Sequence, residues 1–487
     1  MGWKEAAEPV LTRMPAVRRP EGHVPFKRKL MWTAGILMLY FFLTNVTLLG
    51  YQTGGSGDFF GEFRAILAGA HGSVLQVGIG PIVTASIVLQ LLGGANLLGL
   101  DTDDPRDQVL YQGLQKLLVV VMVVLTGLPM VFAGGFLPAQ QQLQLGGFAL
   151  DQSQVQLLMF AQILVGGILI LYMDEVVSKW GVGSGIGLFI IAGVSQRLVT
   201  GLIQPAPGGF FYNWYQILTG QIEVGSLVSS AGLQTLLINE GQIIALLTTL
   251  LIFAIVVYAE SVRVEIPLSH ARVKGARGRF PVKLIYASVL PMILVRAVQA
   301  NVQFMGQILN SQWGSMPGWL GTYSAQGQPT GGFFYYVAPI YSPDDWLWIT
   351  ANISQEWWQV LIRVGIDLTF MVVGGAVFAI FWVETTDMGP ESTAKQIQNS
   401  GMQIPGFRQN VGVIEKVMER YIPQVTVIGG ALVGLLAVWA NMLGTIGQVS
   451  GTGLLLAVSI TYKLYEEIAE EQLMEMHPMM RQMFGNE

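Results

Sequence analysis

The sequence predicts an all-α, polytopic membrane protein with ten transmembrane helices, and three observations support this fold class. Of its 487 residues, 52% are hydrophobic and only 12% are charged, whereas a soluble domain carries about 25% charged residues. The apolar residues gather in runs of about 20, the length that an α-helix needs to cross a bilayer core. Lysine and arginine are concentrated in alternate connections between these runs. A bundle of helices follows, because lipid offers no hydrogen-bond partner to an unpaired backbone.

The predicted spans lie, in chain order, at residues 30–50, 72–94, 114–134, 155–173, 184–203, 241–260, 283–308, 359–383, 424–446 and 449–466. The fifth, seventh and tenth are diluted by Gly, Ser or Gln, so their ends are less sharply marked. A largely polar segment precedes the first span, and no cleavage site follows that span, so we expect no cleavable signal peptide.

The distribution of basic residues predicts that both termini are cytoplasmic. Lysine and arginine precede the first span and fill two loops, 261–282 and 384–423. The stretches 134–154, 198–240 and 304–358 contain neither lysine nor arginine. Because these two kinds of connection alternate along the chain, an even number of spans is consistent with the charge pattern. We therefore expect a multi-pass protein of the cytoplasmic membrane.

A long connection after the fifth span divides the chain into two halves, at residues 1–205 and 206–487. Each half holds five predicted spans. A duplicated unit with an odd number of spans must insert the second time upside down, so the count predicts two inverted halves around a central pore. The residues themselves show no strong repeat, and the prediction rests on topology.

Patterns typical of catalysis and metal binding are missing. The chain has no cysteine, and no lysine follows a glycine, which excludes a Walker A loop. Its four histidines have no paired ligand spacing, and a G-x-S-x-G motif is absent. We expect no enzyme activity, no cofactor and no metal. A secondary transporter built from inverted repeats remains the alternative.

Three segments combine glycine with branched aliphatic residues in an uncharged membrane helix: GIGPIVTASIVLQLLGG from Gly78, GSGIGLFIIAGVSQ from Gly183, and SGTGLLLAVSI from Ser450. Glycine lets helices bend or approach closely, while branched side chains can meet around an axis. The pattern is compatible with a conduit that has an apolar lining. On the pattern alone, ordinary packing of small residues between helices is the favoured interpretation.

Longer motifs, in order along the chain, resemble the SecY family, the central subunit of the Sec protein-conducting channel, of the archaeal type. They are GIGPIVTAS, LYMDEVVSKWGVGSGIGLFIIAGVSQ, YAESVRVEIPLSHARVKGARGRFPVKLIYAS, FWVETTDMGPESTAK and GFRQNVGVIEKVMERYIP. The resemblance implies a channel that moves unfolded secretory polypeptides across the membrane and releases membrane segments laterally into the bilayer. It also implies SecE and an archaeal beta-type subunit, which complete a heterotrimer, together with ribosomes, signal sequences, nascent chains and SecD/SecF as partners. An insertase without a pore is a further alternative.

The resemblance also implies a ring of six aliphatic side chains that closes the pore: Ile79, Val83, Ile186, Ile190, Ile293 and Leu456. Spacings of four place two pairs of these residues each on one helical face. An apolar constriction suits a conduit for chains of any sequence, because polar groups would hold some substrates too strongly. It also sheds water and so hinders ions.

Further roles are implied for three sets of residues. Between the second and third spans on one side and the seventh and eighth on the other, a lateral gate would use Thr84 and Asn301. A plug near residues 61–71 would include Gly61, Glu62, Phe63, Arg64, Ala65, Ile66 and Leu67, and ribosome binding would use Arg272, Lys274 and Arg408. The simpler interpretations are that Thr84 bonds to its own helix, that the plug segment is a surface helix or loop, and that the basic residues reflect orientation alone.

Charged residues inside predicted spans need partners. Arg363 and Asp367 are four residues apart, so we expect them to pair with each other on one helical face. Arg296 lies one turn beyond Ile293, where members of the resembled family carry a small or uncharged residue. We expect its side chain to snorkel outward or to line an outer funnel.

Overall fold

The fold is described from a computed structural model of the chain. It covers residues 3–22, 24–52, 67–94, 98–99, 104–132, 137–145, 148–222, 230–270, 277–285, 290–313, 316–324, 327–348, 353–386, 388–399, 402–403 and 411–476. Each of the ten predicted spans overlaps a helix. These helices are α2 (Phe26–Asn45), α4 (Gly80–Gly94), α5 (Pro105–Phe132), α6 (Gln152–Trp180), α7 (Gly185–Ile203), α10 (Ile243–Ser261), α11 (Leu290–Trp313), α13 (Trp357–Thr385), α15 (Val411–Leu443) and α16 (Gly451–Met476).

Length and composition identify membrane-spanning helices among the described residues. Six are long and apolar enough to cross a bilayer: α5, α6, α7, α10 with the turns before it, α13 and α15. Helix α4 is apolar, but its 15 residues are fewer than a full crossing needs. The chain is thus a mostly helical, polytopic membrane protein, and the count of ten spans stays a prediction.

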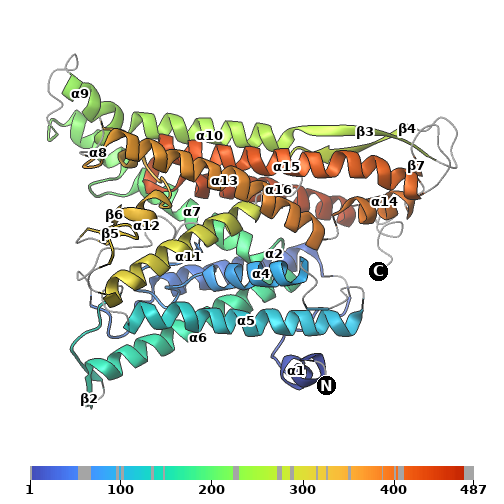
Figure 1. Cartoon of the computed structure of the whole chain (residues 1–487), viewed down its shortest axis with the longest axis horizontal. Helices are drawn as coiled ribbons and strands as arrows, with labels where there is room; N and C mark the ends of the chain where they lie inside the picture. Colours follow the sequence, from blue (N-terminus) through green and yellow to red (C-terminus); the bar gives the residue numbers. More distant parts are fainter. Residues whose placement is uncertain are drawn as a thin grey trace.

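The long helices run side by side along the longest axis of the molecule (Figure 1). Three connections lie at one end: the hairpin of β1 (Gln142–Leu145) and β2 (Phe148–Asp151), the pair α8 (Phe210–Leu218) and α9 (Ser230–Gln234), and the region of β5 (Thr322–Tyr323), β6 (Pro329–Gly331) and α12 (Gly332–Tyr336). They belong to the three stretches without lysine or arginine. Their charged residues are all acidic: Asp151, Glu223, Glu240, Asp344, Asp345 and Glu356. We therefore call this end the acidic end of the molecule.

At the opposite end lie β3 (Arg263–His270), β4 (Arg277–Lys283), β7 (Met402–Gln403) and α14 (Pro390–Asn399) (Figure 1). The three strands form one antiparallel sheet in the order β4-β3-β7. Strand β4 ends at Lys283, where the seventh span was predicted to begin, and the described part of helix α11 is Leu290–Trp313. That predicted boundary was wrong because alternating residues such as those of FPVK suit a strand as well as a helix end.

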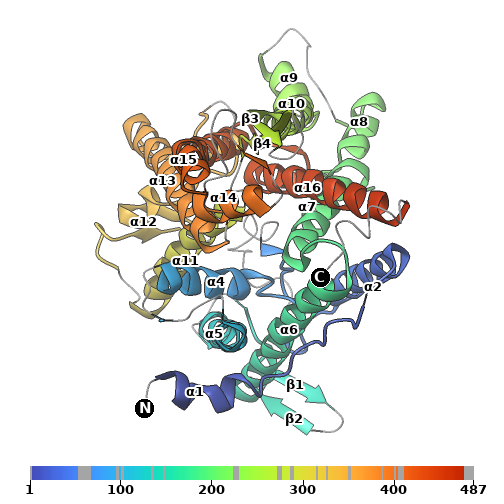
Figure 2. The same ribbon diagram turned by 90° about the vertical axis from the view of Figure 1, so that its right-hand side faces the viewer.

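Helices within each predicted half pack together. Helix α6 contacts α2, α5 and α7, and helix α15 contacts α10, α13 and α16. Glycine allows the tight crossing of α13 and α15, because a Cβ atom on Gly430 would lie 2.5 Å from the carbonyl oxygen of Gly375. Viewed along the helices, α4, α5 and α6 lie on one side and α10, α13 and α15 on the other (Figure 2).

The two groups of helices meet along two seams. At the first, α4 packs against α11 and α13. At the second, α7 packs against α16 and the short 3₁₀ helix η3 (Ile446–Gln448), where a Cβ atom on Gly201 would lie 2.2 Å from the Cα atom of Gly447. The remaining short elements are α1 (Trp3–Leu11), the π-helix η1 (Thr235–Asn239) and the 3₁₀ helix η2 (Pro343–Asp345).

Candidate functional site

The start of α4 is shaped by Gly78 and by the chain segment that precedes it. Gly78 has φ +57°, and a Cβ atom there would lie 2.1 Å from the carbonyl oxygen of Leu67. The same carbonyl accepts a hydrogen bond of 2.7 Å from the backbone N–H of Ile79. A residue with a side chain would suffer strain and collision at this position. Ile79 is fully buried, and Val83 follows one turn later with 3% exposure.

The start of α7 is held by two side chains that cap its free N–H groups. The hydroxyl of Ser184 accepts a bond of 3.2 Å from Gly187 N–H. From the end of α6, the carboxylate of Asp174 accepts a bond of 2.9 Å from Ile186 N–H. Gly185 permits this approach, since a Cβ atom there would lie 2.5 Å from the Cα atom of Asp174. Both contacts fix the position of Ile186 in the first turn of α7. Through the helix backbone they also fix the position of Ile190, one turn later.

All six residues of the predicted ring lie in one apolar cluster. Ile190 and Leu456 are fully buried, Ile293 is 2% exposed, and Ile186 is partly buried against the same cluster. They come from α7, α11, α16 and the start of α4, and thus from both predicted halves. The cluster contains many other residues, so the assignment of these six as a ring stays a prediction.

The two predicted gate residues contact each other across the first seam. The side-chain amide of Asn301 on α11 donates a hydrogen bond of 3.2 Å to the hydroxyl of Thr84 on α4. Thr84 in turn donates to the carbonyl of Gly80, at 2.9 Å, within its own helix. The two interpretations of Thr84 are therefore compatible, because one hydroxyl can donate one bond and accept another.

A cavity of about 40 Å³ adjoins this contact. Its lining residues come from α4, α5, α11 and the segment before α4, and they include Leu67, Pro81, Thr84, Thr126, Asn301 and Phe304. The volume exceeds the 10–15 Å³ or so that one water molecule requires.

The predicted plug is described only at its end. Residues Gly61, Glu62, Phe63, Arg64, Ala65 and Ile66 lie outside the described residues, whereas Leu67 is described. Besides the bond that Ile79 N–H donates to the carbonyl of Leu67, the hydroxyl of Tyr40 on α2 donates a bond of 3.0 Å to the carbonyl of Ala68. The ring of Tyr40 stacks on that of Phe189 at 5.0 Å. The end of the plug segment is thus attached beside the predicted ring.

The predicted ribosome-binding residues Arg272, Lys274 and Arg408 also lie outside the described residues. The strands that flank them are described. Pairing of Ser269 with Gln403 and of His270 with Met402 joins β3 to β7. The last described residues before these positions, His270 and Gln403, therefore lie on neighbouring, paired strands.

Arg296 is fully buried, which corrects the expectation that it snorkels outward or lines a funnel. Its guanidinium donates to Gln299 at 2.6 Å, to Asp367 at 3.3 Å and to Thr452 at 3.2 Å. These partners join α11, α13 and α16. A buried charge is tolerated when an opposite charge and hydrogen bonds compensate its lost hydration.

The predicted pair of Arg363 and Asp367 is wrong. Asp367 faces α11, where it also accepts a bond of 2.9 Å from Gln299, and it accepts one of 3.3 Å from Ile340 N–H. Arg363 donates instead to the carbonyl of Pro339 at 2.7 Å and pairs with Asp345 at 3.5 Å. Tertiary partners outcompete the local pair because it offers only a few tenths of a kcal/mol.

Sequence reasoning missed the roles of Gln299 and Thr452. Both are polar residues in a predicted span, and each lies buried beside Arg296. Their polarity in an apolar helix was the available signal, since polar groups inside a membrane need partners.

Comparison with known proteins gives consistent matches over the whole chain. The SecY family model matches residues 73–465, and the model of the plug domain of Sec61p matches residues 38–72, a range that includes the predicted plug residues. A protein translocase subunit SecY from Haloarcula marismortui is 73% identical over 490 residues, with 100% of both chains covered. One from Archaeoglobus fulgidus is 48% identical over 499 residues, with 99% of both chains covered.

Solved structures are similar over nearly the same length. One, described as "The structure of a protein conducting channel", has a TM-score of 0.79 and 37% identity, covering 97% of this chain and 98% of the other. Another, described as "Sec61 in the Canine ribosome-channel complex from the endoplasmic reticulum", has a TM-score of 0.76 and 37% identity, with the same coverage.

Proposed function

The chain belongs to the SecY family and is a protein-conducting translocation channel, and we propose that its predicted ring is the constriction through which an unfolded polypeptide passes. The observation that carries this proposal is the shared apolar cluster of the six side chains, which converge from α7, α11, α16 and the start of α4. The comparisons do not favour the alternative of a secondary transporter.

The constriction has to accept polypeptides of any sequence without binding a particular one tightly. A passing chain presents every kind of side chain in turn, so a polar or charged constriction would bind some segments strongly and stall them. Branched aliphatic side chains contact any segment weakly and close together when it has passed. The same apolar surface disfavours water in the narrow passage, which hinders ion flow through the idle channel.

Lateral release of membrane segments fits the seam between α4 and α11. The bond between Asn301 and Thr84 is weak, because hydrogen bonds between membrane helices average about 0.6 kcal/mol. The cavity beside it gives an arriving apolar helix a place to begin insertion. A hydrophobic signal sequence that packs there replaces one weak polar contact with apolar contacts.

The proposed channel works with partner subunits and with the ribosome, and its orientation in the membrane decides which end they bind. We assign the acidic end to the outside and the opposite end, with both termini, to the cytoplasm, as the distribution of lysine and arginine indicates. The basic side chains of Arg272, Lys274 and Arg408 suit the phosphates of ribosomal RNA. SecE and a beta-type subunit complete the heterotrimer, with SecD/SecF as further partners. The chain itself catalyses no reaction, and chain elongation supplies the energy most simply.

Crosslinking of a stalled nascent chain tests the pore. The chain has no cysteine, so a single Ile190→Cys variant reports one position by disulfide formation with a cysteine in the nascent chain. Val199→Cys is the matched control, because it lies on the same helix, about 180° around the helix axis from Ile190, and is 54% exposed. We expect crosslinks from position 190 and few from position 199. Equal crosslinking from both positions would overturn the assignment of the ring.

A further inference from the structure

Helix α8 presents an uncovered apolar face within the connection between α7 and α10. Its sequence, FFYNWYQIL, contains no charged residue. Phe211, Tyr215 and Leu218 are 61%, 61% and 80% exposed. Their spacing of four and then three residues places them on one side of the helix. We call these three residues the α8 stripe.

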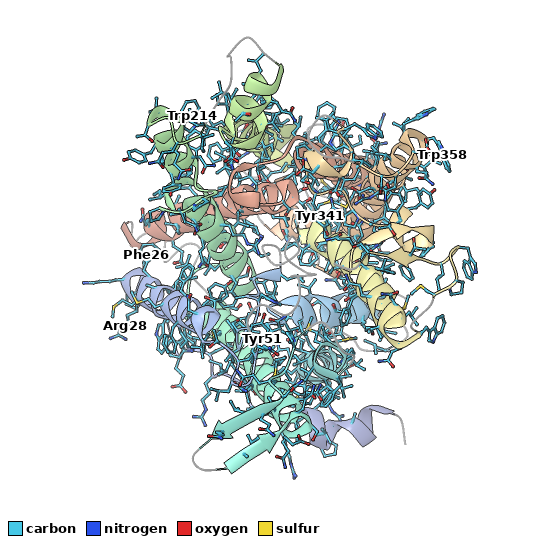
Figure 3. All side chains as sticks on the ribbon, turned by 90° about the vertical axis from the view of Figure 1, so that its left-hand side faces the viewer. Phe26, Arg28, Tyr51, Trp214, Tyr341 and Trp358 are labelled. Carbon is cyan, nitrogen blue, oxygen red and sulfur yellow. The ribbon has the colours of Figure 1, made fainter. Side chains whose placement is uncertain are left out.

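Two side chains outside the α8 stripe attach the helix to the turn that leads into α10. The side-chain amide of Asn213, which is 2% exposed, donates bonds of 3.1 and 3.2 Å to the backbone carbonyl and the carboxylate of Glu240. The indole N–H of Trp214 donates a bond of 3.0 Å to the carbonyl of Gly241. Figure 3 looks onto this end of the molecule and shows Trp214 near its rim. These bonds fix α8 beside the first residue of α10, Ile243.

Exposed apolar residues also lie on the two membrane-spanning helices that flank α8 in the chain. Helix α7 is a membrane-spanning helix that ends at Ile203, and α10 belongs to the span that ends at Ser261. Near the acidic end, exposed apolar residues occur on both helices, with Ile203 at 64% on α7 and Leu247 at 60% on α10. Because α8 is attached where these two spans leave the membrane, its exposed face lies at the level of the bilayer surface.

We propose that α8 lies flat in the headgroup layer of the leaflet at the acidic end, with the α8 stripe inserted among the upper acyl chains. Tyrosine and tryptophan concentrate at this depth because their rings are apolar and their polar tips remain hydrated. The absence of charge from α8 favours neutral lipid over recognition of an anionic headgroup. The connection between the two predicted halves is thereby anchored to the membrane at its surface. This inference does not depend on the assignment of the pore ring.

Spin labels test the proposal in the full-length chain, purified in its native assembly and reconstituted into phosphatidylcholine vesicles. Single variants Phe211→Cys and Leu218→Cys carry the label on the stripe. Gln216→Cys carries it on the same helix about 130° away, where the native side chain bonds to Tyr212. Collision with oxygen reports contact with acyl chains, and collision with a water-soluble nickel chelate reports contact with water. Translocation by each labelled variant checks that it is folded.

We expect the ratio of oxygen to nickel collision rates to be at least threefold higher at positions 211 and 218 than at position 216. A ratio at the stripe no higher than at position 216, with strong nickel collisions, would overturn the proposal in favour of a face exposed to water. Low collision rates for both reagents at positions 211 and 218 would also overturn it, because a protein partner or a second copy of the chain then covers the stripe.

Discussion

Replacing Asn301 with leucine tests whether the polar contact at the first seam restrains the gate. The substitution removes the hydrogen bond of 3.2 Å that α11 donates to Thr84 on α4. Thr84 keeps its own bond to Gly80, so its hydroxyl hydrogen retains a partner. Asn301 is exposed, and its replacement therefore leaves no buried polar group behind. The energetic loss is confined to one bond between two membrane helices.

The expected shift in the equilibrium between the closed and the open gate is small but measurable. Such bonds contribute about 0.6 kcal/mol on average and up to about 1.7 kcal/mol. With RT near 0.6 kcal/mol, the average value shifts the equilibrium between closed and open gate by about threefold. If gate opening limits entry, a substrate with a weakened signal sequence should be translocated about three times more efficiently, whereas one with a strong signal sequence should change less.

Reconstituted vesicles with ribosome-bound secretory chains provide the assay. The measured quantity is the fraction of a substrate with a weakened signal sequence that becomes protected from added protease. Met305→Leu is the control, since Met305 is 53% exposed on the same helix and its replacement conserves apolar character. Thr84→Val should act in the same direction as Asn301→Leu. Unchanged translocation of the weakened substrate by Asn301→Leu refutes the gate contact as an energetic restraint.

Three other outcomes are expected. Ile190→Asn should raise ion conductance of the idle channel in planar bilayers, because the substitution hydrates a fully buried apolar position; unchanged conductance contradicts the ring. Arg296→Met should lower the free energy of unfolding by about 3–5 kcal/mol by leaving Asp367 buried without its counter-charge. Combining it with Asp367→Met should restore much of that loss in thermal unfolding, and additive losses would contradict the pairing. Arg408→Glu should weaken ribosome binding most at low salt, so equal affinity at low salt would exclude a role for Arg408.

Hydrophobic length predicted the helices well where the whole helix is apolar. The predicted span 184–203 corresponds to α7, Gly185–Ile203, and the span 359–383 lies within α13, Trp357–Thr385. Helix α15 begins at Val411, before the predicted span of 424–446. The segment VGVIEKVMER is too polar for a span, yet backbone hydrogen bonding continues through it. Hydropathy reports immersion in lipid, and helices extend beyond the bilayer.

Family resemblance identified Thr84 and Asn301, which lie far apart in the sequence and form a bond in the structure. Spacing alone gives no reason to connect them, because the approach of α4 to α11 is a property of the whole bundle. The i, i+4 rule failed for Arg363 and Asp367 for the same reason. It evaluates two residues on an isolated helix, whereas the packing of α13 turns Asp367 toward α11 and leaves Arg363 beside the carbonyls of Ala338 and Pro339.

The position of Arg296 shows what an apolar constriction demands of its surroundings. It follows Ile293 by three residues on α11, so the two side chains lie on nearly the same face of the helix. A guanidinium with free N–H groups at this site would draw water toward Ile293, and hydration of the constriction would admit ions. Bonds to Asp367, Gln299 and Thr452 direct N–H groups of both terminal guanidinium nitrogens into the contacts between α11, α13 and α16, and the remaining Nε–H is buried without a hydrogen-bond partner. Keeping the predicted ring dry therefore depends on this buried network as well as on the aliphatic residues themselves.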